Sequence, residues 1–125
     1  MPSKLIWIVI VGAVVVFLLV KRLTQISPAT ARQHLAHGAL IIDVRSPEEF
    51  RSGQVPGAMN IPLGDLPDTF PLRVKDKNQV VLLHCLSGGR SGIAQQKLRG
   101  LGYANVFNLG SLARAQQIIA GAKGS

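Results

Sequence analysis

An uninterrupted apolar run near the amino terminus limits what this chain can fold into. Leu5–Val20 contains no charge, proline or strongly polar side chain, while Lys4 precedes the run and Lys21 and Arg22 follow it. As a helix the run would rise about 1.5 Å per residue, roughly 24 Å in all. The long basic side chains at its ends would help it cover a hydrocarbon core of about 30 Å. The pattern predicts a transmembrane anchor over residues 1–23 that contacts the membrane through residues 5–20.

Two other interpretations of the run stay open. A cleavable signal peptide has the same basic start and apolar centre, and Ala29–Ala31 resembles a small-residue cleavage site. That triplet lies well beyond the run, however, and Lys21–Arg22 is typical of a stop-transfer sequence. A buried core helix would need a domain that surrounds it, which the remaining about 100 residues cannot do. The anchor is therefore the favoured interpretation.

Charges beside the run predict its orientation. Lys21, Arg22 and the more distant Arg32 follow it, against Lys4 on the other side, and basic residues favour the cytoplasmic side. We expect a single-pass protein of the inner, cytoplasmic membrane whose domain faces the cytoplasm. The single cysteine, Cys85, agrees with this, because a reducing compartment would keep it a free thiol.

The formal net charge of +8 raises the question of a nucleic-acid partner. The basic residues are spread along the chain, and one Trp, one Tyr and four Phe leave little to stack on bases. Attraction of the basic residues to an anionic lipid leaflet is a simpler explanation of the positive net charge. We therefore expect a membrane partner and no nucleic acid.

Beyond the run, residues 24–125 alternate helical signals with short apolar segments. This pattern predicts one α/β domain, a parallel sheet flanked by helices. Strands are expected at 40–44, 58–61, 79–84 and 106–109. Helices are expected after Ser27-Pro28, after the capping box that begins at Ser46, across Ile93–Leu101 and from Leu112, whereas residues 63–74, rich in proline, favour short helical turns.

The strand at 79–84 leads directly into a reactive-looking loop. Its sequence is Cys85-Leu86-Ser87-Gly88-Gly89-Arg90-Ser91, a glycine-rich turn ahead of a helix. Such a turn forms a cup of backbone N–H groups at a positive helix end, which suits an anion. A phosphate-binding P-loop would need a lysine here, and no dinucleotide-binding glycine motif is present. The donors and Arg90 should lower the pKa of the Cys85 thiol and hold an anionic substrate against it.

Cys85 and the three histidines also have purely structural interpretations. A buried cysteine that only ends a strand is the alternative for Cys85, and the loop that follows argues against it. His84 should point away from Cys85 by strand alternation, as a packed histidine and not a base. His34 and His37 have no partners at metal-ligating spacing, so we interpret them as surface residues and expect no metal site.

Three stretches between about Ile26 and about Leu112 resemble signatures of the rhodanese family. They are Leu40–Arg45 with the following Glu48–Phe50, then Gly53–Pro62, then the loop Cys85–Ser91. The resemblance implies an α/β domain around a parallel sheet, with no metal or organic cofactor. It also implies that Cys85 takes a sulfane sulfur from a small-molecule donor such as thiosulfate, becomes a persulfide, and passes the sulfur to a thiol or protein acceptor.

The resemblance also assigns roles by position. Arg90 would stabilise the anionic donor and the persulfide, and the substrate would be bound by the backbone N–H groups of Leu86, Ser87, Gly88, Gly89, Arg90 and Ser91. Asp43 and Arg45 would support this loop and not touch substrate. The chain departs from many family members after the last strand, where Gly110-Ser111-Leu112 lacks a second glycine and a nearby tryptophan.

Two rival functions stay open. Cell-cycle dual-specificity phosphatases resemble rhodaneses but have five residues between cysteine and arginine, whereas four separate Cys85 from Arg90. A tighter loop crowds phosphate and suits a single sulfur atom. A non-catalytic interaction module would use the same fold to bring a partner to the membrane and would need no reactive thiol. Sulfur transfer requires Cys85 to be ionised and reachable among main-chain amides.

Overall fold

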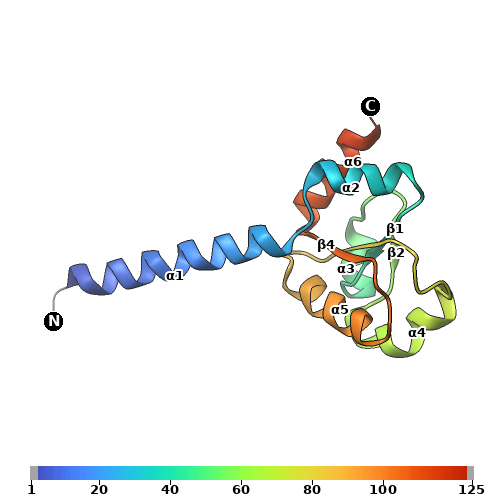
Figure 1. The fold of residues 1–125 in the computed structure, drawn as a ribbon, viewed down its shortest axis with the longest axis horizontal. Helices are drawn as coiled ribbons and strands as arrows, with labels where there is room; N and C mark the ends of the chain where they lie inside the picture. The colour runs from blue at the N-terminus through green and yellow to red at the C-terminus, as the bar shows by residue number, and fades with distance from the viewer. Residues whose placement is uncertain (1–2, 124–125) are drawn as a thin grey trace.

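Four parallel strands form the centre of the domain (Figure 1). They are β1 (Leu40–Asp43), β2 (Met59–Asn60), β3 (Val81–His84) and β4 (Val106–Gly110), in the spatial order β2-β1-β3-β4. Because Asp43 is the register partner of His84, the carboxyl ends of β1 and β3 lie level. The predicted parallel sheet is confirmed. The structure is a computed structural model that describes residues 3–123. Met1 and Pro2 of the predicted anchor (1–23), and residues 124–125 of the predicted domain (24–125), lie outside the described residues.

Helices cover both faces of the sheet. α2 (Pro28–Ala36) and α6 (Leu112–Lys123) pack on one face, and α4 (Leu66–Arg73) and α5 (Gly89–Gly100) on the other. The strand side chains alternate accordingly: Ile41 and Leu82 are buried toward α2 and α6, while Ile42 and Leu83 are buried toward α4 and α5. Such nearly continuous apolar strands are typical of a sheet buried on both sides.

Local capping determines where the predicted helices begin. The Ser27 hydroxyl accepts from the Thr30 N–H at the start of α2. At α3 (Pro47–Ser52), the Ser46 hydroxyl accepts from the Glu49 N–H and the Glu49 carboxylate accepts from the Ser46 N–H, as the capping box predicts. Both predicted starts are confirmed.

The segment 63–74 is more regular than expected. A short 3₁₀ helix, η1 (Leu63–Asp65), leads into the α-helix α4, where the proline content predicted only turns. Pro67 lies in the first turn, where no backbone donor is needed, and only Pro71 lies inside the helix. Full burial of Leu66 and Phe70 against the sheet stabilises this short helix despite Pro71.

The apolar run lies in α1 (Ser3–Thr24), which projects from the domain (Figure 1). Its 22 residues would span about 33 Å as a helix. Among the described residues it is the one helix long and apolar enough to cross a membrane. None of its residues is buried, so the interpretation as a core helix is wrong.

The domain begins directly where α1 ends. Gln25 forms a parallel bridge with Asn108, and the Ile26 N–H donates to the Asn108 carbonyl at 3.0 Å. The residues after the helix thus extend the sheet alongside β4. As a result the end of α1 is held close to the carboxyl end of the sheet.

Candidate active site

The segment Leu86–Ser91, here called the sulfur loop, follows β3 and Cys85 and includes the first turn of α5, which begins at Gly89. It is fastened to the chain after β4. The Cys85 N–H donates to the Gly110 carbonyl at 3.2 Å, and the Leu112 N–H donates to the Leu86 carbonyl at 3.2 Å. Ser87 and Ser111 form an isolated bridge. The segment Gly110-Ser111-Leu112 therefore forms one wall of the site.

Hydrogen-bond donors converge on the Cys85 sulfur. The Gly88 N–H donates to Sγ at 2.9 Å, and the Ser91 hydroxyl lies 3.5 Å from it. Burial acts to raise the pKa of Cys85, but hydrogen bonds from the Ser91 hydroxyl and from the Ser91, Gly88 and Ser87 amides outweigh it and lower the pKa below its ordinary value. These donors to the sulfur, from Ser87, Gly88 and Ser91, all lie within the Leu86–Ser91 segment that is predicted to bind substrate.

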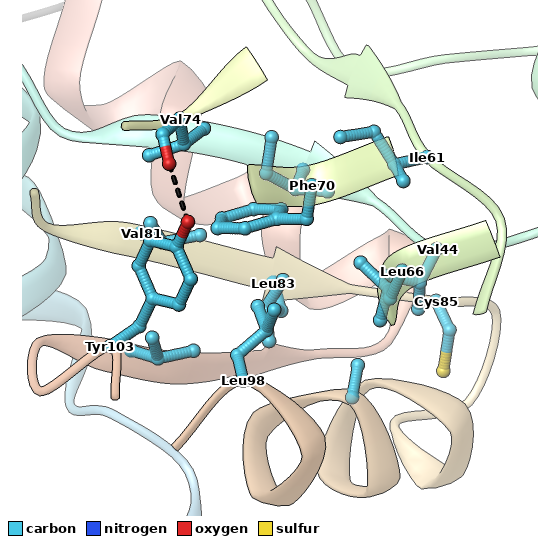
Figure 2. Close-up of a cluster of buried hydrophobic side chains, with 13 residues drawn as sticks. Val44, Ile61, Leu66, Phe70, Val74, Val81, Leu83, Cys85, Leu98 and Tyr103 are labelled. Carbon is cyan, nitrogen blue, oxygen red and sulfur yellow. Dashed lines mark hydrogen bonds between the residues drawn. The ribbon is translucent and has the colours of Figure 1, made fainter. Parts of the chain in front are cut away.

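The sulfur is enclosed, which corrects the expectation that it is reachable. Cys85 has 0% of its surface exposed and belongs to the apolar cluster that contains Val44 and Leu66 (Figure 2). The amides are turned toward the sulfur as expected, but the loop also covers it. A donor can therefore contact Sγ only when the residues that enclose the sulfur move.

The Arg90 guanidinium is paired with the Glu49 carboxylate, which raises the Arg90 pKa, and the nearby charge of Cys85 contributes to the same rise. Nη1 and Nη2 of Arg90 donate to the two carboxylate oxygens of Glu49 at 2.7 and 2.9 Å. Arg90 is the main reason that the pKa of Glu49 is lowered to about 2. The capping box at Ser46 orients this carboxylate toward the loop. The pairing has no signal in the sequence, because the residues lie far apart in the chain.

Asp43 and Arg45 form a buried ion pair at the carboxyl end of β1. Arg45 donates to both carboxylate oxygens of Asp43 at 2.8–3.0 Å and to the Gly53 carbonyl at 2.6 Å. These bonds hold the end of β1, and Oδ2 of Asp43 also lies 3.7 Å from Nε2 of His84, the residue before Cys85. The Asn60 side-chain amide donates to the main-chain carbonyls of Asp43 and Arg45, so β2 shares in this arrangement.

The three histidines lie in three different environments. His84 is fully buried, its Nδ1 lies 3.2 Å from the Cys85 carbonyl, and burial lowers its pKa; the prediction of a packed histidine is confirmed. His37 is exposed, but His34 is half-buried and stacks on Phe107 at 5.2 Å, so only His37 fits the surface interpretation. Among residues 3–123 no group of three His, Cys, Asp or Glu side chains could hold a metal.

Sequence reasoning missed Asn108 and Gln25. The Asn108 side chain donates to the Gly88 carbonyl at 3.2 Å and accepts from the Ser91 hydroxyl at 2.7 Å. A Cβ at Gly88 would lie 3.0 Å from the Gln25 side-chain nitrogen, so this amide packs on the sulfur loop. Neither residue belongs to a motif that the sequence analysis identified, and the β4 edge brings both to the site.

Comparison with known proteins decides the family. The family described as "Rhodanese-like domain" matches residues 27–113. The chain belongs to the rhodanese-like family. Thiosulfate sulfurtransferase PspE of Escherichia coli is 42% identical over 71 residues, covering 57% of this chain and 68% of the relative. Thiosulfate sulfurtransferase GlpE of Pseudomonas entomophila is 31% identical over 85 residues, covering 68% of this chain and 76% of the relative.

Solved structures agree with this assignment. The human single-domain sulfurtransferase TSTD1 aligns with a TM-score of 0.62 and 31% identity, over 75% of this chain and 95% of that one. A rhodanese from Escherichia coli, solved with anions, aligns with a TM-score of 0.59 and 39% identity, over 62% of this chain and 91% of that one. At the level of the rhodanese-like family these relatives support sulfurtransferase activity.

Proposed function

We propose that this rhodanese-like protein is a membrane-anchored sulfurtransferase whose Cys85 carries sulfur as a persulfide. The donor would be a small sulfane-sulfur compound such as thiosulfate, and the acceptor a thiol or a protein. The observation that carries the proposal is the set of donors aimed at Sγ, from the Ser87, Gly88 and Ser91 amides and the Ser91 hydroxyl. These donors stabilise a negative sulfur, which both reaction steps require.

The loading step forms one bond and breaks one. The Cys85 thiolate attacks the outer sulfur of thiosulfate, a Cys85 Sγ–S bond forms, and the S–S bond of thiosulfate breaks with its electron pair leaving on sulfite. The product is an anionic persulfide, and no proton or redox partner is consumed. The donors that hold the thiolate are placed to hold the terminal sulfur of this persulfide once the loop has moved.

Intact-mass measurement tests the proposed function. After treatment with thiosulfate, the wild-type mass should rise by one sulfur atom, with an equal amount of sulfite released, and Cys85→Ser should show neither change. Dithiothreitol should reverse the added mass. A folded wild type that neither gains sulfur nor releases sulfite would contradict the proposal.

The proposed location is the inner membrane, with the domain facing the cytoplasm. Support comes from the length and exposure of α1 and from the basic residues Lys21 and Arg22 at its carboxyl end. The chain should sediment with membranes and keep its full mass after expression, whereas a cleaved signal would leave a shorter chain. Protease added to intact spheroplasts should spare the domain, and its degradation there would contradict the proposed orientation.

The enclosed sulfur favours a second candidate, a non-catalytic interaction module at the membrane. With 0% of Cys85 exposed, the domain in this conformation could recruit a partner without sulfur chemistry. In that case Cys85→Ser would leave the cellular phenotype intact and a pull-down would recover one stable partner. Hydrolysis of aryl phosphates would instead favour the phosphatase alternative, which the four-residue spacing between Cys85 and Arg90 opposes.

A further inference from the structure

The end of α1 and the first turns of α5 enclose a groove beside the sulfur loop. Its volume is about 430 Å³, and Figure 1 shows α1 leaving the domain next to α5 and β4. We call it the interfacial groove. Its lining includes residues from α1, the sulfur loop and α5, among them Phe17, Val20, Lys21, Gly88, Gly92 and Ile93.

The interfacial groove has an apolar outer part and a polar inner end. Phe17 and Val20 belong to the predicted membrane-spanning run, and Ile93 faces them from α5 with 51% of its surface exposed. At the inner end lies Gly88, whose N–H contacts the Cys85 sulfur, together with the side-chain amides of Gln25 and Asn108. The groove thus matches a molecule with an alkyl chain and a small polar head.

The charge of the groove favours an anionic head. Lys21 is the one charged side chain among the described residues that line it, and no carboxylate does so. A thiolate would be attracted to this site, whereas a cationic head would be repelled. Because Lys21 directly follows the apolar run, the charge lies where α1 would leave the bilayer.

Resting on the function proposed above, we propose that the interfacial groove binds a membrane-dissolved alkyl thiol as the sulfur acceptor. Its chain would enter from the bilayer between α1 and α5, and its thiolate would reach the sulfur loop at Gly88. A water-soluble anion such as thiosulfate would gain no binding free energy from the apolar side chains of this groove. The two substrates of the reaction would then reach Cys85 from different phases.

The transfer step balances without a further reactant. The thiolate of the acceptor attacks the terminal sulfur of the Cys85 persulfide, a new S–S bond forms on the acceptor, and the Sγ–S bond breaks with its electron pair returning to Cys85. The products are an alkyl persulfide anion and the Cys85 thiolate. The enzyme is then ready for another donor.

A labelling experiment tests binding apart from the chemistry. The full-length Cys85→Ser variant in phosphatidylcholine vesicles is irradiated with decanethiol that carries a diazirine on its chain, and the labelled peptides are mapped by mass spectrometry. We expect labels on both sides of the groove, near Phe17–Val20 and near Ile93. Labels spread along α1 with none on α5 would show membrane partition alone and would overturn the inference.

A kinetic experiment tests the acceptor role. Wild type is first loaded from thiosulfate, the loading is verified by mass, and discharge to decanethiol is compared with discharge to 2-mercaptoethanol. Ile93→Gln should lower the decanethiol to 2-mercaptoethanol rate ratio roughly fivefold, the effect of removing one aliphatic contact. Gly92→Leu, which fills the groove, should lower the same ratio.

The matched control is Leu72→Gln on α4, another exposed aliphatic side chain that lies outside the groove. Its rate ratio should equal that of wild type. Equal ratios in wild type, Ile93→Gln and Gly92→Leu would overturn the inference while leaving the proposed function intact. Failure of wild type to load from thiosulfate would count against the proposed function alone, because labelling in the groove does not depend on a persulfide.

Discussion

At the scale of single residues, the sulfur loop depends on a side chain from another strand. Asn108 is buried, donates to the Gly88 carbonyl, and accepts from the Ser91 hydroxyl and the Gly110 N–H. Its amide nitrogen holds the Gly88 carbonyl, and its Oδ1, 2.7 Å from the Ser91 hydroxyl, competes with Sγ at 3.5 Å for the single proton of that hydroxyl. Asn108 is thus a positioning residue, one step removed from the sulfur.

Replacing Asn108 by alanine should weaken both the fold and the reaction. The change leaves buried groups without partners, which costs about 1–3 kcal/mol of unfolding free energy. Persulfide formation should slow roughly tenfold because the Gly88 carbonyl loses its hydrogen bond from Asn108, and the pH midpoint of the reaction should fall because the Ser91 hydroxyl is then free to donate to Sγ. Asn105→Ala, at an exposed hydrogen bond to the Asn78 carbonyl, is the control and should keep the wild-type pH midpoint. An unchanged midpoint in Asn108→Ala would refute its positioning role.

The Ser91 hydroxyl should set the ionisation of Cys85. It is the largest of the influences that lower the pKa of this thiol, ahead of the amides of Ser91 and Gly88. Ser91→Ala should therefore raise the pKa, so that less thiolate is present at neutral pH. Ultraviolet absorbance of the thiolate, followed against pH, measures this without a reagent entering the loop. A midpoint equal to that of wild type would contradict the assignment.

Glu49 should restrain Arg90 over the whole neutral range. Its folded-state pKa of about 2 lies below the ordinary value of 4.5, so the carboxylate pairs with Arg90 above about pH 4.5 and loses the pairing only as the pH falls toward 2. We expect Glu49→Gln to lower the KM for thiosulfate two- to fivefold, since it removes a negative charge near a site for a dianion. Glutamine keeps the capping box.

Arg90→Ala is the companion variant and should raise the KM for thiosulfate in steady-state assays. If Glu49→Gln and Arg90→Ala both left the KM unchanged, the pair would have no part in donor binding. Arg51→Ala serves as a control, because Arg51 forms a separate exposed pair with Glu48.

At the scale of elements, the junction between β4 and α6 forms one wall of the site. Gly110 has a φ of 96°, and a Cβ there would lie 2.8–3.0 Å from the side-chain amide of Gln25. Its carbonyl also accepts from the Cys85 N–H. The turn after β4 therefore fixes the sulfur loop only while this position is glycine.

Gly110→Ala should destabilise the domain by about 1–3 kcal/mol, because alanine is strained at this φ. Gly53→Ala is a matched control: Gly53 has a φ of 166°, an extended angle open to any residue, and a Cβ at this position would meet no atom within 4 Å. Urea unfolding of both variants measures the difference. Equal midpoints would show that the turn tolerates a side chain.

At the scale of the whole molecule, α1 and the domain meet without a linker. Gln25 follows α1 directly, bridges to Asn108 in β4, and packs on Gly88 of the sulfur loop. If α1 spans a membrane as proposed, its direction would determine how the sulfur loop faces the bilayer. Sulfur donor, acceptor and membrane would meet at this corner of the domain.

Inserting four Gly and Ser residues between Thr24 and Gln25 should separate loading of Cys85 from the preference for an alkyl thiol acceptor. Loading of Cys85 from thiosulfate should continue, because the domain keeps its own core. The preference for decanethiol over 2-mercaptoethanol should fall to the level of Ile93→Gln, because α1 no longer lines the interfacial groove. The same insertion in the exposed turn at Asp76–Asn78 is the control and should keep the preference.

Features that depend on near neighbours in the chain could be predicted from the amino-acid sequence alone. The apolar run predicted α1, the periodicity of residues 24–125 predicted a parallel sheet, and Ser27 and Ser46 marked helix starts that the structure confirms. The sulfur loop was also visible, since its glycines and Cys85 lie within one short segment. These signals depend on residues that are close in sequence, so they can be interpreted without knowledge of the tertiary packing.

The surroundings of the sulfur, in contrast, emerged only from the packed fold. Arg90 meets Glu49 across 41 positions of sequence and Ser91 meets Asn108 across 17, contacts that arise because parallel strands bring their carboxyl ends to one edge. The burial of Cys85 likewise follows from how the loop packs on the end of the core. Side chains interact when they are close in space, and for residues far apart in the chain that closeness is set by the fold.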